Sequence, residues 1–404
     1  MAGSAENAPT WRSSFPAMGT RVDIIGWGGD GMTIVNAVVG VVARHEDMWS
    51  MFRPSSEVSQ LNAAVRDAAR GVGTSRCGSD STQAGPGLVV SEETDRLLRD
   101  ALALAEATGG AFNPLIGPLV AAWDVKAMRA AYVAGAPLPP APSALAVEAA
   151  LRASSWGLLS RVGERRWAMG VPGESVDGVD APSPSLDLGG IAKGYTADAC
   201  RDLAVAMGAR GVLVSVGTSS VSVFGTRADG SSWRAGLRDP HGGPTSVAGV
   251  VELPAGAMAS LSTSGDNLGP LGGVGVGCAA GPAAGRAAER AAGREAGRAA
   301  ERAAGREAGA ASDRRARETP RETSADGGRV FDHHIIDPRK GYPAHAGVRQ
   351  VSVVASSGVL AEALSTALLV EPSIDVSDVV ARWARVTGTP ASAKVVGLVR
   401  AAQG

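Results

Sequence analysis

The sequence SLDLGGIAKGYTAD, at residues 185–198, decides how the rest of the chain is interpreted. It begins as a short apolar strand carrying Asp187, and the pair Gly189-Gly190 separates this strand from a helix with Lys193 in its first turn. Two glycines let backbone amides approach an anion, the start of a helix favours negative charge, and a lysine supplies a mobile cation. The stretch therefore indicates a phosphate site. The alternative is an ordinary strand-to-helix turn with a surface lysine, and the Walker pattern G-x-x-x-x-G-K-S/T is absent.

The composition is that of a globular protein. Of 404 residues, 45% are apolar and 20% are charged, and the formal net charge is −1. These values exclude a disordered chain and give no electrostatic reason to expect nucleic-acid binding. The three cysteines, Cys77, Cys200 and Cys278, have no metal-ligand spacing, which argues against a disulfide scaffold and a zinc site. We see no signal peptide and no apolar run of about 18 residues, and therefore expect a cytoplasmic protein without a membrane span.

Strands and helices mix along the chain without strict alternation. Apolar periodicity and turn residues predict strands at 20–26, 211–224 (a hairpin around 217–219), 233–237, 247–253 and 351–354, and helices at 32–61, 91–108, 191–207 and 358–370. Because a regular strand–helix–strand order is missing, the fold class is predicted to be α+β. The segments 70–87 and 170–185 are rich in small and polar residues and are predicted to be surface loops.

A low-complexity segment interrupts this pattern. Residues 284–295 read AGRAAERAAGRE, and residues 296–307 repeat all twelve. Because the segment offers almost no large apolar side chain to bury, we expect residues 268–329 to form a solvated insertion, either a fraying helix or a disordered linker. The alternative is a binding arm for an acidic partner. Its weak charge, 11 Arg against 8 Asp and Glu from 284 to 329, makes that alternative the less favoured one.

Residues 361–368, AEALSTAL, form a candidate metal site. Glu362 and Thr366 are one helical turn apart and share a face, with Ser365 beside them. A carboxylate with hydroxyl groups provides hard oxygen ligands, which suit Mg²⁺ completed by waters and phosphates. A partly exposed helix face is the plainer interpretation of the same spacing.

Three more segments hold polar residues with less specific patterns. FDHHIIDPRKGYP at 331–343 contains a turn after His333 and His334, and such a histidine pair is more often structural than catalytic. ASLSTSGDN at 259–267 is predicted to be a polar loop, with Asp266 as its local cap. GGAFNPLIGPLVAAW at 109–123 is predicted to be a loop followed by an apolar segment that serves packing.

Together, and in this order, these segments resemble the ApbE family, the FAD:protein FMN transferases. The matching pieces are PAMGT at 16–20, FRPSSEVSQLN at 52–62, GGAFNPLIGPL at 109–119, LDLGGIAKGYTAD at 186–198, STSGD at 262–266, HHIIDPRKGYP at 333–343 and AEALSTALLV at 361–370. The resemblance implies a single ApbE-like (T-fold-like) α+β domain over residues 10–404, with mixed or antiparallel sheets flanked by helices and residues 268–329 inserted into it.

The resemblance also implies an activity and a set of site residues. Family members bind FAD with Mg²⁺ and move the FMN moiety onto a Thr or Ser hydroxyl of an acceptor flavoprotein, releasing AMP. By position, the FAD site would be lined by Met18, Phe52, Ala111, Phe112, Asn113, Asp187, Lys193 and His334. The metal would be held by the Gly190 carbonyl with Glu362, Ser365 and Thr366. Asp266 would be the base that activates the acceptor hydroxyl, and Lys193 and His334 would complete the catalytic groups.

Four departures from the family pattern leave alternatives open. Glu362 stands where Asp is usual, Asn113 where Asp is common, Thr218-Ser219 where Gly and an acidic or amide residue are usual, and Asn267 where an aromatic is frequent. An FAD pyrophosphatase, with water replacing the acceptor hydroxyl, is one alternative. A non-catalytic flavin-binding protein is the other, because the changes at Glu362 and Asn113 affect predicted site positions.

Overall fold

The computed structural model describes residues 9–69, 87–134, 136–172, 181–240, 242, 246–265 and 334–400. All of them belong to one unit of the chain, which comprises Met1–Val276 and Asp332–Gly404. The predicted insertion at 268–329 and the predicted loop at 70–87, apart from its last residue, lie outside the described residues.

A seven-stranded sheet organises this unit, and each pair of neighbouring strands in it is antiparallel. Its order is β1-β2-β6-β7-β10-β13-β14, and the strands are β1 (Thr10–Ala17), β2 (Thr20–Trp27), β6 (Gly211–Val216), β7 (Ser220–Gly225), β10 (Ala259–Gly265), β13 (Val348–Ala355) and β14 (Ala393–Arg400). Every residue of β6 is buried, because side chains on both faces of a central strand meet a covering layer. Val212 and Val214 pack with helices on one face, and Leu213 packs with a smaller hairpin on the other.

Smaller strands complete the β structure. The hairpin of β8 (Arg234–Arg238) and β9 (Val247–Glu252) covers the second face of the large sheet. The remaining strands are β3 (Leu88–Val89), β5 (Arg166–Met169) and β4 (Leu159–Gly163), which form a three-stranded sheet, and β11 (Ile336–Asp337) with β12 (Tyr342–Pro343).

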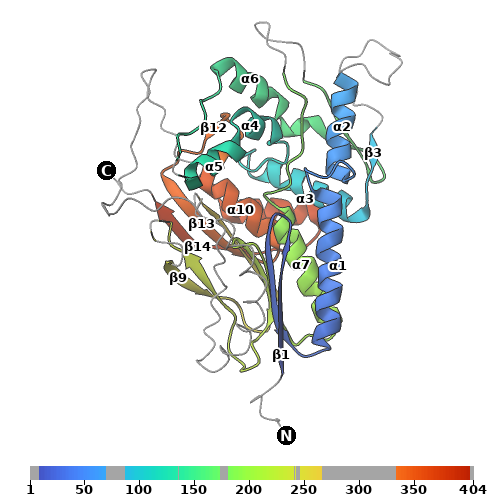
Figure 1. Cartoon of the computed structure of the whole chain (residues 1–404), viewed down its shortest axis with the longest axis vertical. Coiled ribbons are helices and arrows are strands. Elements are labelled where there is room, and N and C mark those ends of the chain that lie inside the picture. Colours follow the sequence, from blue (N-terminus) through green and yellow to red (C-terminus); the bar gives the residue numbers. More distant parts are fainter. Residues whose placement is uncertain are drawn as a thin grey trace, which may run out of the picture. The chain divides into compact units, whose positions relative to one another are not determined.

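The helices that matter for the site are α7 (Ala192–Ala206) and α10 (Gly358–Val370), which pack against each other and against the large sheet (Figure 1). Twelve of the thirteen residues of α10 are buried. A helix that is apolar nearly all round belongs inside a protein, so the polar residues that α10 carries are enclosed. The other helices are α1 (Gly31–Trp49), α2 (Glu57–Ala69), α3 (Glu92–Ala107), α4 (Gly117–Ala122), α5 (Val125–Ala134), α6 (Ala144–Ala153), the short 3₁₀ turn Trp156–Leu158, and α11 (Val376–Thr387).

Three sequence predictions were wrong. The first is the short strand predicted to carry Asp187: residues 181–188 belong to no helix or strand, because the backbone groups of Leu186 and Asp187 bond to the Asn62 side chain and the Pro114 carbonyl instead of a neighbouring strand.

The second is the helix predicted at 32–61, which is two helices, because α1 ends at Trp49 and α2 begins at Glu57. Pro54 lies between them, where it cannot donate a helical hydrogen bond, and the Ser56 hydroxyl donates instead to the Ser50 carbonyl.

The third error concerns residues 259–267, where we expected a polar loop. Residues 259–265 form strand β10 instead. Its serines alternate with Leu261 on opposite faces of the sheet: Ser260 and Ser262 bond to partners on the helix side, and Leu261 packs under the β8–β9 hairpin. Small polar residues at every second position resemble loop composition, although here they fit closely under two helices.

The packing of α1 against α7 buries a histidine with a consequence for stability. His45 is fully buried, and its Nδ1 lies 2.9 Å from the Thr196 hydroxyl. That hydroxyl donates to the Ala192 carbonyl, so Nδ1 is the donor to Thr196, and Nε2 lies 3.7 Å from a Glu93 carboxylate oxygen. Burial is the main cause that lowers the pKa of His45 to about 4, although Glu93 opposes it. The folded protein therefore resists protonation of His45.

We expect this resistance to destabilise the folded state in mild acid. Between pH 6.5 and 4 the unfolded chain binds a proton at His45 that the folded chain does not, so the free energy of unfolding should fall as pH falls, by about 1.4 kcal/mol per pH unit. Urea unfolding at pH 4.5, 5.5 and 6.5 would measure this slope in the parent and in His45→Gln. Burial raises the pKa of Asp100 to about 6, which produces the opposite slope in both proteins. The difference between their slopes therefore isolates His45, and equal slopes would contradict the prediction.

Candidate functional site

The candidate site forms where α7 and α10 cross. At the crossing Gly194 and Gly358 touch: a Cβ on Gly194 would lie 2.4 Å from the Gly358 carbonyl oxygen, and one on Gly358 would lie 2.3 Å from the Gly194 carbonyl oxygen. Both distances are far inside van der Waals contact, so the two backbones approach more closely than any other residue would allow. This approach brings the first turn of α7 beside Glu362 of α10.

Glu362 is 4% exposed, and its carboxylate is the centre of the site. Its Oε2 accepts the Gly194 N–H at 2.8 Å, and its Oε1 accepts the hydroxyl of Ser220, the first residue of β7. Lys193 Nζ lies 3.8 Å from Oε1 and also donates to the Gly189 carbonyl at 2.5 Å. The predicted phosphate-binding lysine and the predicted metal carboxylate are therefore neighbours, although 169 residues separate them in the sequence.

A cluster of hydroxyl groups lies one turn further along α10. The Ser264 hydroxyl of β10 lies 2.8 Å from that of Ser365 and 3.0 Å from that of Thr366. Ser365 is fully buried, and its hydroxyl also contacts Ser262 at 3.1 Å and donates to the Glu362 carbonyl at 3.0 Å. Thr366 is partly exposed, so its hydroxyl is the more accessible of the two predicted hydroxyl ligands.

The turn before α7 is held in place by two segments that are distant in the sequence and by its own Asp187. Asn62 of α2 bonds both backbone groups of Leu186, at 2.7 and 3.2 Å. The Asp187 N–H donates to the Pro114 carbonyl at 2.9 Å, and the Asp187 carboxylate accepts the Gly189 N–H at 2.8 Å. Asp187 thus shapes the glycine turn from which Lys193 projects.

The segment 111–113 was predicted to line the FAD site, and the structure places its side chains largely inside the protein. Ala111 is fully buried and Phe112 is 4% exposed, and the Phe112 ring lies against Gly190. Asn113 is 7% exposed: its amide nitrogen donates to the Ser154 carbonyl at 2.6 Å, and its amide oxygen accepts the Leu115 N–H at 2.8 Å. Phe112 therefore packs against the glycine turn, and Ala111, beside it in the sequence, belongs to the hydrophobic core.

The Ser154 contact explains why Asn stands at position 113, where the family commonly has Asp. A carboxylate cannot donate to a carbonyl, so Asn113→Asp would place a buried charge against an oxygen lone pair. We expect this substitution to lower the free energy of unfolding by about 2 kcal/mol or more. Urea unfolding at pH 7 would measure the loss, with the exposed Asn36→Asp on α1 as the matched control. Equal stability of the Asn113→Asp protein and the parent would contradict this account.

The remaining predicted residues lie on other segments of the chain or outside the described residues. Met18 and Gly19 both have positive φ, +52° and +67°, and form the two-residue turn between β1 and β2. Phe52 is 85% exposed, with Lys126 Nζ 6.0 Å from its ring centroid. His334 is half-buried at the start of the last described range. Asp266 directly follows β10 but, like His333, lies outside the described residues, so its role as a base stays a prediction.

Sequence reasoning missed two residues of the site. Ser220 binds the Glu362 carboxylate, and Asp198, four residues after Gly194, accepts a hydrogen bond from the first turn of α10. The available signals were the alternating serines of β7 and β10 and the acidic residue that ends the GGIAKGYTAD stretch. Neither signal could have identified the bonded partner, because Glu362 and Gly358 are more than 100 positions away from Ser220 and Asp198.

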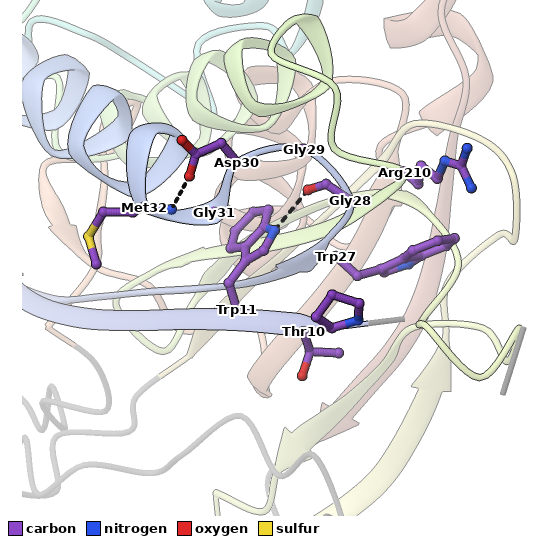
Figure 2. Close-up of a pocket in the computed structure, with 10 residues that line it drawn as sticks. Thr10, Trp11, Trp27, Gly28, Gly29, Asp30, Gly31, Met32 and Arg210 are labelled. Atoms are coloured by element: carbon purple, nitrogen blue, oxygen red, sulfur yellow. Dashed lines mark hydrogen bonds between the residues drawn. The ribbon is translucent and has the colours of Figure 1, made fainter. Parts of the chain in front are cut away.

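An open groove of about 640 Å³ lies at the other end of the β1–β2 hairpin (Figure 2). None of the predicted site residues lines it; its lining includes Trp11, Trp27 and Arg210. The Met18 turn and the Thr10–Trp27 pair stand at opposite ends of eight-residue strands, roughly 25 Å apart at about 3.3 Å per residue. Arg210 of the groove follows the last turn of α7, whereas Lys193 lies in its first turn, so this fifteen-residue helix separates the groove from the candidate site by roughly 20 Å at about 1.5 Å per residue. At its wall the Trp11 indole lies over Gly31 and donates to the Gly28 carbonyl at 2.9 Å.

The donor chemistry at the α7–α10 crossing fits Mg²⁺. In the described part of the chain no three His, Cys, Asp or Glu side chains gather into a metal cluster. The crossing instead offers the Glu362 carboxylate beside the hydroxyls of Ser264 and Thr366, all hard oxygen donors. Mg²⁺ is commonly held by one or two carboxylates, with waters and substrate phosphates completing its shell.

Of the helices in the described ranges, none has both the length and the apolar composition that a membrane crossing requires.

Known proteins share both the sequence and the fold. The ApbE family profile matches residues 18–292 and 319–387. An FAD:protein FMN transferase of Treponema pallidum is 32% identical over 290 residues, which are 70% of this chain and 61% of that protein, and one of Vibrio cholerae is 26% identical over 275 residues, 66% and 69%. The chain thus spans less than two thirds of the Treponema protein.

Two solved structures support the fold assignment. The ApbE protein of Thermotoga maritima matches with a TM-score of 0.60 at 22% identity, covering 98% of this chain and 97% of that one. The flavin transferase ApbE of Vibrio cholerae matches with a TM-score of 0.59 at 20% identity, covering 98% of each chain. The α+β class and the ApbE-like fold predicted from the sequence are confirmed. The family profile covers most of the sequence, and the chain therefore belongs to the ApbE family.

Proposed function

We propose that this protein is a Mg²⁺-dependent FAD:protein FMN transferase, which moves FMN from FAD onto a Thr or Ser hydroxyl of an acceptor flavoprotein and releases AMP. The observation that carries the proposal is the meeting of Lys193 and Glu362, 3.8 Å apart at the start of α7. Relatives named FAD:protein FMN transferase, at 26–32% identity, support the same activity.

The chain's own groups suit the cleavage of a pyrophosphate. The acceptor oxygen forms a bond to the phosphorus on the FMN side of FAD, and the bond from that phosphorus to the AMP oxygen breaks. Charge then grows on the phosphate oxygens, so positioned cations and amides account for most of the rate. Lys193 projects from the first turn of α7 and neutralises these oxygens, while the glycine turn shaped by Asp187 lets backbone amides approach them.

The metal would be held by Glu362 and Thr366, with Ser365 behind them and the Gly190 carbonyl on the side of the turn. When bound, Mg²⁺ would supply a Lewis acid and a template for the diphosphate. Ser365 is fully buried and bonded to neighbouring hydroxyls, so its main contribution is to orient Ser264 and Thr366. Hydrogen bonds from the Gly194 N–H and the Ser220 hydroxyl hold the Glu362 carboxylate in position.

A base is needed because a neutral hydroxyl is a weak nucleophile. We assign this role to Asp266, which follows the β10 residues Ser264 and Gly265 in the sequence and would take the acceptor's proton as its oxygen attacks. His334 and Phe52 would contact FAD, as would Met18 at the tip of the β1–β2 hairpin.

Mass spectrometry of a candidate acceptor tests the function. A flavin-carrying domain with a Thr or Ser acceptor would be incubated with this protein, FAD and Mg²⁺, and the expected result is the added mass of FMN on that residue. Release of FMN and AMP without an acceptor would favour a pyrophosphatase. Retained flavin with neither product would favour a binding protein. One of the two residues that motivate this alternative, Asn113, is already explained by its hydrogen bond to the Ser154 carbonyl.

A further inference from the structure

The helices α7 and α10 exchange hydrogen bonds in a reciprocal way. The N–H of Gly194 in α7 donates to Glu362 of α10 at 2.8 Å, and the N–H of Gly358 in α10 donates to Asp198 of α7 at 2.6 Å. In each helix the acidic residue follows the glycine by four positions, in GYTAD at 194–198 and GVLAE at 358–362. A carboxylate one turn after the glycine of each helix therefore reaches the first turn of the other.

Both glycines need such a partner. Gly194 is the third residue of α7 and Gly358 is the first of α10, and N–H groups in the first turn have no acceptor within their own helix. The residues in the N-cap positions, Ile191 and Ser357, form no side-chain cap. Each helix is thus capped by an acid of the other, and the negative charge is also favoured by the helix dipole.

The two carboxylates differ in their remaining contacts. Asp198 Oδ1 accepts the hydroxyls of Ser222 in β7 and Ser260 in β10, at 2.6 and 2.5 Å, and Arg201 at 2.9 Å. Burial opposes the charge of Arg201, but the carboxylates of Asp198 and Asp202 outweigh it and raise the pKa of that guanidinium. The two serines anchor Asp198 to two strands of the sheet, and Arg201 holds it from α7 itself. Glu362 is bonded to the sheet through Ser220 of β7 alone and has Lys193 as its other neighbour.

We propose that Asp198 is a positioning residue for the site: it fixes the first turn of α10 to the sheet and thereby sets where Glu362 and Thr366 lie. The part that concerns the metal rests on the proposed function. Because Gly194 and Gly358 are in backbone contact, a shift of the first turn of α10 also moves Glu362 away from the Gly194 N–H. The two capping bonds therefore depend on each other.

Hydrogen–deuterium exchange tests the reciprocal caps without reference to activity. In Asp198→Asn, an amide replaces one acceptor oxygen and faces a donor, so exchange in a peptide covering 358–362 should rise at least tenfold, and exchange in one covering 192–196 should rise with it. Asp202→Asn is the matched control, since Asp202 bonds the same Arg201 at 2.8 Å but is 53% exposed and makes no bond to α10. Unchanged exchange in Asp198→Asn would overturn the proposal.

Titration calorimetry with Mg²⁺ tests the positioning role. At a temperature where urea unfolding shows the variant to be folded, the Kd for Mg²⁺ should rise about tenfold in Asp198→Asn and stay unchanged in Asp202→Asn. A residue that only stabilised the fold would leave the Kd of the folded variant unchanged, and that result would overturn the role. If Asp198→Asn does not fold, the double variant Ser222→Ala/Ser260→Ala takes its place, because it removes two hydrogen bonds that hold Asp198. It should raise both the exchange in the two peptides and the Kd for Mg²⁺ about threefold. The absence of both increases would overturn the proposal.

The exchange and calorimetry measurements distinguish a failure of the proposed function from a failure of the positioning role of Asp198. A parent protein that binds no Mg²⁺ and transfers no FMN would contradict the proposed function, while the exchange measurement would still decide whether Asp198 holds α10. A parent that transfers FMN, together with an Asp198→Asn variant equal to it in both measurements, would leave the function standing and refute the role of Asp198.

Discussion

Replacing Lys193 by methionine is expected to lower the rate of FMN transfer at least 100-fold while the protein stays folded. The Lys193 ammonium group is 3.8 Å from Glu362 at the start of α7, and removing one group that stabilises developing charge typically costs about 10²–10³ in rate. Its side chain is 27% exposed and contributes one hydrogen bond, to Gly189, so the free energy of unfolding should change little.

Initial rates with saturating FAD and acceptor, together with urea unfolding, would measure both effects of Lys193→Met. The exposed Lys394 of β14 provides the control, because Lys394→Met removes the same charge away from the site. A Lys193→Met enzyme with the parent's rate would show that the phosphates of FAD bind elsewhere.

Replacing Glu362 by glutamine is expected to reduce transfer by at least as much and also to destabilise the protein. The substitution removes the carboxylate of the proposed metal site. Its NH₂ group must face either the Gly194 N–H, which can only donate, or the buried Ser220 hydroxyl, which would have to accept and so lose the Glu362 oxygen to which it now donates. A buried donor left without its acceptor costs about 1–3 kcal/mol.

Two measurements distinguish these effects of Glu362→Gln. Calorimetry should show weaker Mg²⁺ binding, and urea unfolding should show lower stability, whereas Glu148→Gln on α6, where the side chain is 56% exposed, should change neither. Transfer at the parent's rate, with unchanged dependence on Mg²⁺, would remove Glu362 from the metal site.

Much of the scaffold around the site could be predicted from local pattern. The helices at 191–207 and 358–370 agree with α7 and α10 to within one residue at each end, because apolar periodicity and flanking polar or glycine residues mark their limits. The hairpin around 217–219 is also confirmed, since two β-branched runs flank its turn. Each of these signals lies within about twenty residues of sequence.

The contacts that build the site could not be predicted in this way. Ser220 meets Glu362 across 142 positions, and Asp198 meets Gly358 across 160, so no local pattern contains both partners. The role of Asn113 depends likewise on the Ser154 carbonyl, which no spacing indicates. The resemblance to a family named Lys193, Glu362 and Thr366, but it did not show how Glu362 is held.

The burial of α10 has a practical consequence for anyone who wishes to change this protein. A helix that carries the proposed metal ligands while twelve of its thirteen residues are buried has little tolerance for substitution, because a change of volume in a core typically costs about 1–5 kcal/mol. Laboratory evolution toward another metal or another nucleotide would therefore exhaust the stability of the natural sequence within one or two steps on this helix. A thermostabilised starting protein, improved at surface positions on other elements, would give such an effort room to proceed.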